Sequence, residues 1–185
     1  MTTHRVHAIR FATFEARRRA ENFLGGDPHD GPMPFDYFVF VVDGPSGAIV
    51  VDTGFSAEVA ARRGRTHLIC PGEALRRLGV DPAEVKHVVL THLHYDHCGN
   101  QGLFPAATFH LQVAEMAYAT GPCMRHGALR LGYDPDDLAE TIRKLFDGRL
   151  VYHDGEAELA PGVTLHRVGG HTDGQMAVRV VTGAG

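Results

Sequence analysis

The segment Thr91-His92-Leu93-His94-Tyr95-Asp96-His97 places three imidazoles and one carboxylate within six consecutive positions. It follows the apolar run His87-Val88-Val89-Leu90, which is bounded by polar residues and predicts a buried strand. The cluster therefore lies where a strand ends and the chain turns. The neutral imidazole is the commonest metal ligand in proteins near neutral pH. Four ligand-type side chains at one strand end predict a metal site.

The spacing also predicts how the ligands are shared. His92 and His94 are two residues apart, so on an extended chain their side chains point the same way and can bind one ion. Asp96 and His97 follow where the chain curls, and they can face a second ion close by. Nitrogen and carboxylate ligands suit zinc, with iron, manganese or cobalt as alternatives. A solvated polar turn with chance histidines is the alternative without a metal, and the agreement of position with chemistry disfavours it.

The HxHxDH pattern of this segment resembles the signature of the metallo-β-lactamase superfamily of dinuclear metal hydrolases. Two more segments resemble elements of that superfamily and occur in the expected order: Val50-Val51-Asp52-Thr53-Gly54 and Gly169-Gly170-His171-Thr172-Asp173-Gly174-Gln175. The resemblance implies that His171 is the third histidine of the first metal. Within the superfamily the chain is most similar to the N-acyl-homoserine lactonases, on the strength of Phe35-Asp36-Tyr37-Phe38, Tyr95, Cys98-Gly99-Asn100 and Gln175.

Composition and length predict a single domain over residues 1–185, large enough to bury a substantial core. A net charge of −4 and a pI near 6.3 argue against a nucleic-acid surface. Three widely spaced cysteines suggest no disulfide framework and fit a reducing compartment. Residues 1–14 hold no long apolar segment, and no stretch approaches membrane-spanning length. We therefore predict a cytoplasmic protein without a membrane or nucleic-acid partner, and a homodimer stays open.

The pattern of apolar runs predicts strands and helices in alternating groups. Residues 15–34 are predicted as a loop and residues 121–133 as an irregular insertion. The expected strands cover 6–14, 37–42, 48–51, 85–90, 108–111, 150–152, 157–159, 163–168 and 176–181, and the expected helices cover 56–63, 71–78, 113–118 and 136–146. This order predicts an α+β protein with sheets packed together and helices outside. The resemblance implies an αββα sandwich built from two similar halves.

The C-terminal end departs from the family pattern. In the resembled family, a strand soon after the Gly-Gly-His-Thr element ends in an Asp that bridges the two metals, and a further His completes the second site. Here no Asp follows Asp173 and no His follows His171, and Asp173 occupies the variable position beside His171. We therefore expect the last strands and helices to be missing, which leaves the second metal only Asp96 and His97. The edge left by the lost strands would be exposed and prone to association.

The resemblance implies that a hydroxide held by two zinc ions opens the lactone ring of N-acyl-homoserine lactones. Asp96 is the candidate proton shuttle to the departing alkoxide, because it lies between ligands and can both bind metal and carry a proton. Two alternatives stay open. One is the same chemistry on another ester, thioester or lactam, and the other is a metal-binding fragment without turnover. Two metals per chain would indicate an intact site, and one or none would indicate the fragment.

Several other residues have more than one interpretation. Asp52 either supports a ligand imidazole or forms a turn, and the sequence favours neither. Cys98 is predicted as a small buried side chain rather than a ligand. Four residues around the 121–133 segment are candidates for a cleft wall: Met116, Tyr118, Met124 and Tyr133. Five scattered histidines are predicted as surface or hydrogen-bonded core residues: His67, His110, His126, His153 and His166.

Overall fold

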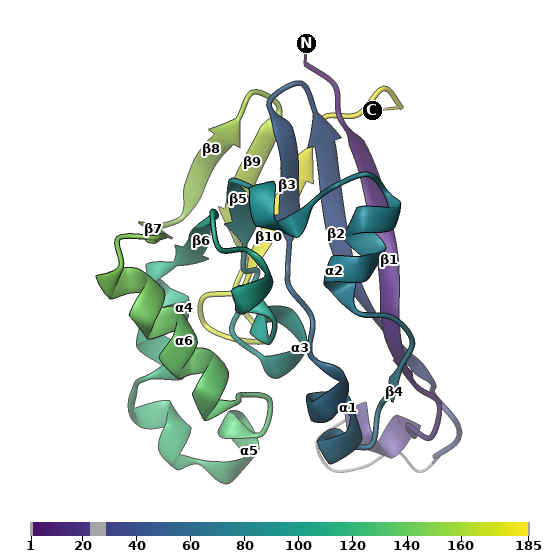
Figure 1. Ribbon diagram of the computed structural model, residues 1–185. Coiled ribbons are helices and arrows are strands. Elements are labelled where there is room, and N and C mark those ends of the chain that lie inside the picture. The colour runs from purple at the N-terminus through teal and green to yellow at the C-terminus, as the bar shows by residue number, and fades with distance from the viewer. Residues whose placement is uncertain (1, 23–28, 185) are drawn as a thin grey trace.

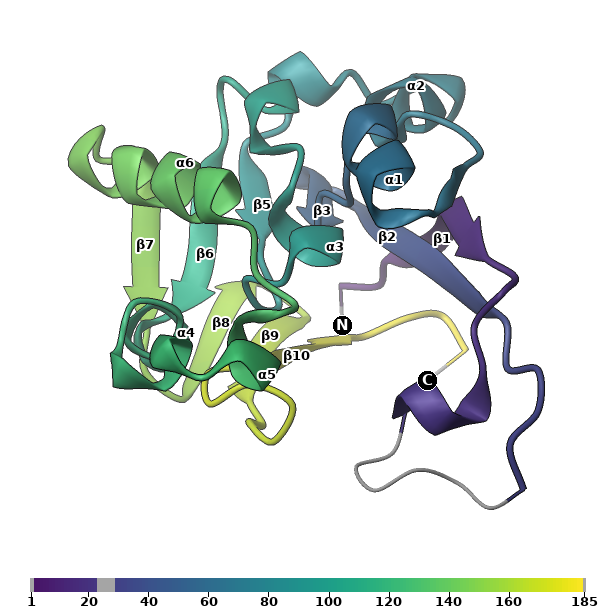
Figure 2. The ribbon, with the colours of Figure 1, turned by 90° about the horizontal axis from the view of Figure 1, so that it is seen from below.

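Two β-sheets lie face to face in the computed structural model, which describes residues 2–22 and 29–184, and helices cover the outer face of the larger sheet (Figures 1 and 2). The strands are β1 (Arg5–Phe14), β2 (Phe35–Gly44), β3 (Gly47–Val51), β4 (Thr66–His67), β5 (His87–Val89), β6 (Thr108–Gln112), β7 (Leu150–His153), β8 (Glu156–Ala160), β9 (Val163–Arg167) and β10 (Met176–Val180). The α-helices are α1 (Ala57–Arg63), α2 (Pro71–Arg77), α3 (Tyr95–Cys98), α4 (Val113–Ala119), α5 (Gly127–Arg130) and α6 (Pro135–Phe146).

The larger sheet has the order β4-β1-β2-β3-β5-β6-β7, and the smaller has the order β10-β9-β8. Strands β1 to β3 form an antiparallel meander, whereas β3, β5, β6 and β7 run parallel to one another. The predicted α+β class and the packing of one sheet on another are confirmed. The described residues supply one helix layer and two sheet layers of the αββα arrangement that the resemblance implied.

Alternation along the central strands builds two separate cores. Val50 and Val88 point toward the helices and pack in the same core as Leu75 of α2. Their neighbours Val51 and Val89 point the other way and pack with the smaller sheet, in the core that contains Leu165 and Met176. Both faces of these strands are therefore buried, which explains why they are apolar runs rather than alternating ones.

Local sequence signals account for the ends of α1 and for the start of α6. Ser56 caps α1 by accepting a hydrogen bond from the Val59 amide at 3.2 Å, and Gly64 ends the helix with a left-handed φ of 66°. Asp134 caps α6 in the same way through the Asp136 amide. The predicted strands are correct to within one or two residues, as the 85–90 run shows, where only His87–Val89 pair.

Two segments differ from their predictions. Residues 121–133 are partly helical, because they contain the 3-10 turn η4 (Pro122–Arg125) as well as α5. The predicted 15–34 loop contains the 3-10 turn η1 (Arg19–Asn22) and a β-bridge between Arg18 and Pro32, and residues 23–28 lie outside the described residues. Single turns show no hydrophobic period, so the sequence pattern missed them, together with β4, α3, η2 (Pro82–Glu84) and η3 (Gln101–Leu103).

The parallel strands position the metal-ligand candidates. Strands β3, β5 and β6 all end at the same edge of the larger sheet. Asp52 follows β3, the 91–97 segment follows β5, and α4 follows β6. The loop before β10 reaches the same edge, where the Met176 amide donates to the Thr91 carbonyl at 2.9 Å.

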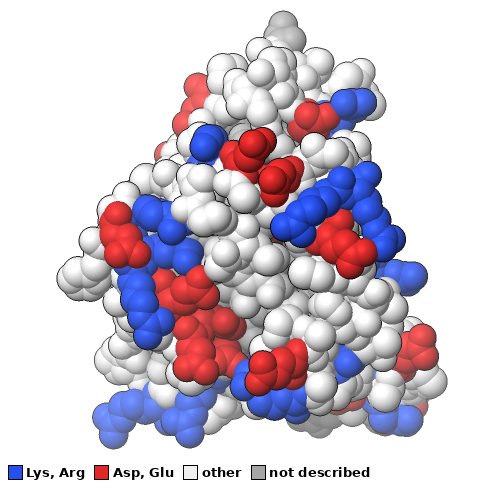
Figure 3. Space-filling view, viewed as in Figure 1, with Lys and Arg blue, Asp and Glu red and all other residues white. Residues whose placement is uncertain are grey.

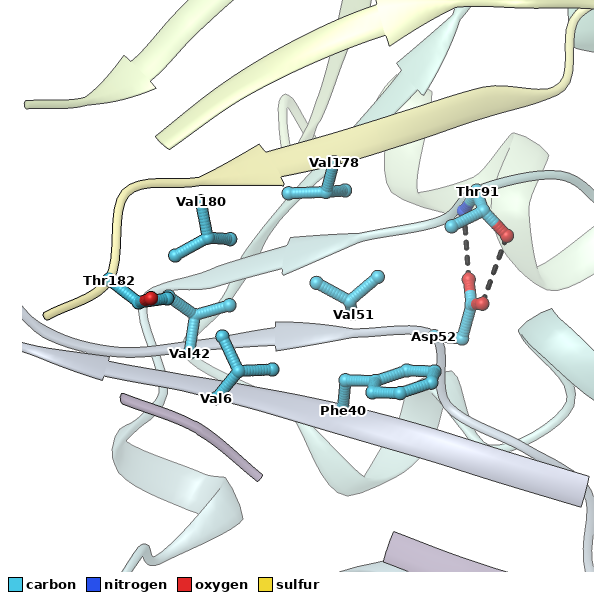
Figure 4. Close-up of a pocket in the computed structure, with 9 residues that line it drawn as sticks. All are labelled: Val6, Phe40, Val42, Val51, Asp52, Thr91, Val178, Val180 and Thr182. Atoms are coloured by element: carbon cyan, nitrogen blue, oxygen red, sulfur yellow. Dashed lines mark hydrogen bonds between the residues drawn. The ribbon is translucent and has the colours of Figure 1, made fainter. Parts of the chain in front are cut away.

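An apolar groove lies between the two sheets beside β10 (Figure 4). Its volume is about 360 Å³, and its walls carry Phe40, Val42 and Val51 on one side and Val178 and Val180 on the other. The groove ends at Asp52 and Thr91, which are hydrogen-bonded to each other. The carboxylate of Asp52 thus separates this apolar groove from the histidine cluster.

Acidic and basic side chains are interspersed on the face shown in Figure 3. Many arginines of the described chain form exposed ion pairs, such as Arg77 with Glu73 and Arg5 with Asp43. Exposed pairs of this kind contribute little to stability. No helix in residues 2–22 or 29–184 combines the length and apolar composition needed to cross a membrane, and the cytoplasmic location stays a prediction.

Asp137, in the first turn of α6, gives a pH-dependent prediction for stability. Burial, helped by the nearby Asp134 carboxylate, raises the pKa of Asp137 from 3.8 to about 7, and its Oδ2 atom has no hydrogen-bond partner among residues 2–22 and 29–184. The folded state therefore binds more protons than the unfolded state between these two values, so this group removes stability as pH rises. Asp137→Asn should raise the free energy of unfolding at pH 8 by about 1–3 kcal/mol. Urea unfolding at pH 5 and pH 8 should show the gain growing with pH, and a loss at pH 8 would contradict the assignment.

Candidate metal centre

Three imidazoles from two distant segments converge at the carboxyl ends of the parallel strands. His92 and His94 follow β5, and His171 comes from the loop before β10. One nitrogen of each lies within 4.8 Å of the others. His94 Nδ1 is 3.2 Å from His92 Nε2 and 3.0 Å from His171 Nε2. Three nitrogens that face one another can offer their lone pairs to one shared cation.

Burial keeps two of these imidazoles neutral. It lowers the pKa of His92 to about 2 and that of His94 to about 4, and neighbouring imidazoles act in the same direction. Both side chains are therefore unprotonated at neutral pH. Metal binding requires neutral imidazole, so the cluster needs no proton release at these two positions.

His97 and Asp96 form a second group beside the first. The backbone is extended at His94, where ψ is 149°, and the chain then curls into α3, which carries both residues. His97 Nε2 lies 3.4 Å from Asp96 Oδ2, and the His92 and His97 rings are 4.0 Å apart between centroids. The predicted curl after His94 therefore brings Asp96 and His97 next to the three-histidine cluster.

Carboxylates on both sides control the proton of His97. Burial alone would lower the pKa of His97, but the charge and hydrogen bond of Asp52 raise it to about 10. Burial alone would raise the pKa of Asp96, but its contact with His97 lowers it to about 2. His97 Nδ1 is directed at Asp52, and His97 Nε2 faces Asp96. A cation at Nε2 would replace one proton there and keep the same carboxylate neighbours.

The contacts of Asp52 favour the support role over the simple turn. Asp52 Oδ2 is 2.7 Å from His97 Nδ1. The Thr91 amide donates to Oδ1 of Asp52 at 2.8 Å, and the Thr91 hydroxyl donates to Oδ2 at 2.9 Å. Asp52 is also the one non-glycine in the described chain with a positive φ, 63°. Asp tolerates this conformation better than most residues, and strain of this kind persists only where contacts enforce it.

Glu115 is the residue that the sequence analysis missed. It lies in the first turn of α4 and is fully buried. Its Oε1 accepts from the Leu93 amide at 2.9 Å and the Tyr133 hydroxyl at 3.2 Å. Its Oε2 accepts from the Thr172 hydroxyl at 2.5 Å and the Gly174 amide at 3.2 Å. One carboxylate therefore joins the residue between His92 and His94 to the loop that carries His171.

The available signal for Glu115 was ambiguous. An acidic residue in the first turn of a helix is common, because it interacts favourably with the helix dipole. Glu115 stands four residues before the buried Ala119, on the same helix face, but a single short helix does not reveal that this face is buried. Nothing in the sequence marked Gly174 as part of the site either, although a Cβ there would come within 2.0 Å of the Glu115 amide nitrogen.

The 121–133 segment packs against the histidine cluster. The Gly132 carbonyl accepts from the Tyr95 amide at 2.8 Å, and a Cβ at Gly132 would lie 2.7 Å from the His94 ring. The Tyr133 ring meets the His94 ring edge-on, with centroids 4.5 Å apart. Glycine at position 132 is therefore required for this close approach.

The cluster opens into a cleft of about 610 Å³. Its walls hold charged, aromatic and aliphatic side chains: Arg17, Phe35, Tyr37, Arg63, Arg65, Tyr118, Leu129, Leu131 and Gln175. Of the predicted wall residues only Tyr118 lines this cleft, whereas Met124 and Tyr133 line a neighbouring pocket and Met116 packs against the core. Cys98 is buried as predicted, with its thiol directed at the Leu93 carbonyl. Among the scattered histidines, His110 is buried and hydrogen-bonded to His87 and His153.

Comparison with known proteins gives one consistent assignment. The model of the metallo-beta-lactamase superfamily matches residues 33–185. An N-acyl homoserine lactonase of Agrobacterium fabrum is 34% identical over 137 residues, covering 66% of this chain and 51% of that protein. A probable metallo-hydrolase of Mycobacterium tuberculosis is 31% identical over 169 residues, covering 78% and 52%. The chain spans about half the length of the curated relatives it matches.

A solved structure shares the fold over the whole chain. It is an N-acyl homoserine lactone hydrolase with the product N-hexanoyl-L-homoserine bound at its catalytic metal centre. The TM-score is 0.74 at 20% sequence identity, covering 100% of this chain and 73% of that one. A dizinc quorum-quenching lactonase, also in complex with its product, gives a TM-score of 0.71 at 16% identity, covering 98% of this chain and 71% of that one.

Glu115→Gln tests whether the buried carboxylate holds the cluster together. In either orientation of the new amide, one buried backbone N–H, that of Leu93 or that of Gly174, loses its acceptor. The free energy of unfolding should fall by about 1–3 kcal/mol. Zinc affinity, measured by competition with a chelator, should fall about tenfold or more. The exposed Glu156 is the control, and Glu156→Gln should change neither quantity. Wild-type zinc affinity in Glu115→Gln would refute the positioning role.

Proposed function

The chain belongs to the metallo-β-lactamase superfamily, and from this premise we propose that it is a zinc-dependent hydrolase that opens the lactone ring of N-acyl-homoserine lactones. The observation that carries the proposal is the adjacency of two ligand groups at the floor of an open cleft. The similarity to N-acyl homoserine lactonases supports the choice of substrate.

We assign the ligands by group. His92, His94 and His171 would hold one ion. Asp96 and His97 would supply some of the ligands of a second ion. Zinc bound in such a site lowers the pKa of its water to about 7, which makes hydroxide available near neutral pH.

The protein's own side chains prepare the site for this chemistry. Neutral His92 and His94 keep their lone pairs free, and Asp52 holds Nδ1 of His97 so that Nε2 faces the cleft. The Asp96 side chain is 17% exposed and lines the cleft, so it reaches both the ligand groups and a bound substrate. We propose that it carries the proton to the alkoxide that leaves when the lactone opens.

The cleft walls suit an acyl substrate. Leu129, Leu131 and Tyr118 give the cleft apolar surface that an acyl chain can cover. Arg63 and Arg65 add polar, positively charged surface to the same cleft. A substrate with a polar ring and an apolar tail would match both kinds of surface.

A second candidate keeps the metal chemistry and changes the substrate. A similarly matched relative is described only as a probable metallo-hydrolase, so a different ester, a thioester or a lactam is the alternative. A fold hosts many chemistries, and specificity depends on the residues of the cleft. A metal-binding chain without turnover is the third candidate, because Asp96 and His97 supply only part of the coordination of a second ion.

Purified protein separates these candidates. Metal content per chain and intact mass should be measured first, followed by turnover of N-hexanoyl-homoserine lactone, a thioester and a β-lactam. We expect the lactone to be the fastest substrate and a chelator to remove its turnover. Faster hydrolysis of the thioester or β-lactam would overturn the substrate assignment. Bound zinc without turnover of any of the three would indicate the metal-binding chain.

Asp96→Asn tests the proton carrier. The amide cannot accept and return a proton, so lactone turnover should fall by about 100-fold or more, while far-UV circular dichroism stays unchanged. Asp43→Asn is the matched control, because Asp43 lies at the end of β2 in a surface pair with Arg5 and should leave turnover unchanged. Near-native turnover by Asp96→Asn would contradict the assignment.

A further inference from the structure

Two tyrosine hydroxyls and one guanidinium meet on a wall of the cleft beside the histidine cluster. Tyr37 comes from β2, Tyr95 stands between His94 and Asp96, and Arg65 follows α1. The Tyr37 and Tyr95 hydroxyl oxygens are 3.3 Å apart, and Arg65 Nε donates to the Tyr95 hydroxyl at 3.3 Å. Tyr37 is 5% exposed and Tyr95 7%, so both residues are largely buried in the wall of the cleft.

This wall has more donors than acceptors. Arg65 carries five N–H donors and no acceptor, and it uses Nε on Tyr95 and Nη1 on the Arg63 carbonyl at 2.8 Å. The two hydroxyls share a single hydrogen bond, which uses one of their two hydrogens. Whichever hydroxyl donates, the other hydrogen finds no acceptor in the described part of the chain. That hydrogen is therefore available to a ligand oxygen placed at the wall.

The wall also carries positive charge without a matching acid. The Arg63 guanidinium lies 3.8 Å from the centre of the Tyr95 ring and donates to the carbonyls of Leu131 and Tyr133. Arg65 lies 3.8 Å from the centre of the Phe14 ring. Within residues 2–22 and 29–184 neither arginine forms an ion pair, whereas the adjacent Arg62 is paired with Asp134.

The remaining charged groups of the cleft do not supply the missing acceptor. Glu21 and Asp96 also line it, but Asp96 is engaged by His97, and neither carboxylate bonds to the wall. Arg17, a further cation of the cleft, lies over the Phe35 ring. The acceptor that fits the wall is therefore negatively charged, and the planar fork of a guanidinium matches a carboxylate.

We propose that Tyr37, Tyr95 and Arg65 bind the carboxylate of an acyl ligand in the cleft. The proposal rests on the proposed function in that the ligand would be a substrate or product of the same site. The carboxylate has two sources: a substituent that the substrate already carries, or the acid that hydrolysis of a lactone creates. The apolar side chains Leu129 and Leu131 in the same cleft would then receive the acyl chain.

Binding to the metal-free protein tests the wall without relying on turnover. The chain contains no tryptophan, so its intrinsic fluorescence reports its five tyrosines, two of which belong to the wall. Hexanoate and its neutral counterpart hexanamide are titrated in parallel by fluorescence and calorimetry. We expect hexanoate to bind at least tenfold more tightly, because hydrogen bonds to a charged group are the stronger ones.

Variants locate the binding to the wall. Arg65→Gln should weaken hexanoate binding about tenfold or more, Arg65→Lys by less, and both should leave hexanamide unchanged. Arg77→Gln is the matched control, because Arg77 is an exposed arginine paired with Glu73 on α2.

Two further ligand pairs distinguish the sources of the carboxylate. Tighter binding of N-hexanoyl-homoserine than of its lactone indicates the product, and tighter binding of monomethyl adipate than of dimethyl adipate indicates an anionic substrate. Either result supports the binding of a carboxylate at this wall.

Three results would each overturn the proposal: equal binding of hexanoate and hexanamide, absence of hexanoate binding, or wild-type hexanoate binding by Arg65→Gln. Absence of turnover would refute the proposed function and leave this binding result standing.

Discussion

The Glu115 carboxylate is the contact on which the geometry of the site depends. It is fully buried, and a buried charge is tolerated only when hydrogen bonds replace the water it has lost. Four donors do so, and they come from the segments around Leu93, Tyr133 and Thr172 to Gly174. None of these segments can move away without leaving part of the charge unpaired. The three histidines are therefore held in place by a carboxylate that need not touch any of them.

A second buried carboxylate performs the same task at the neighbouring group. Asp52 ends β3, and its oxygens reach across to Thr91 and His97 beyond the end of β5. Parallel pairing of β3 with β5 brings these ends to one edge, so the contact is a direct result of the sheet topology. The left-handed backbone at Asp52 is the local cost of directing its side chain there. Both ligand groups are thus supported by carboxylates from other strands or helices.

Arg62, Arg63 and Arg65 follow one another closely in the sequence but have different partners. Arg62 neutralises the buried Asp134, whereas Arg63 ties the 131–133 segment to the ring of Tyr95 through backbone carbonyls. Arg65 bonds to a hydroxyl and a carbonyl and keeps its charge uncompensated within the described residues. Three nearly consecutive arginines therefore have different roles, which depend on the side chains that each meets. The run of arginines in the 62–65 stretch does not by itself distinguish these roles.

What the sequence determined by itself is the local part of the site. His92, His94, Asp96 and His97 could be found because a strand end and a two-residue spacing place them together within one segment. The apolar runs were enough to predict the strands and the packing of one sheet on another. His171 required a resemblance, because its contact with His94 spans 77 positions in the chain. Glu115, the role of Asp52 and the Tyr37–Tyr95–Arg65 wall were decided only by the tertiary structure. Their partners come from separate strands, helices and loops. A hydrogen bond between such elements produces no periodic pattern in the sequence, so the sequence alone does not predict it.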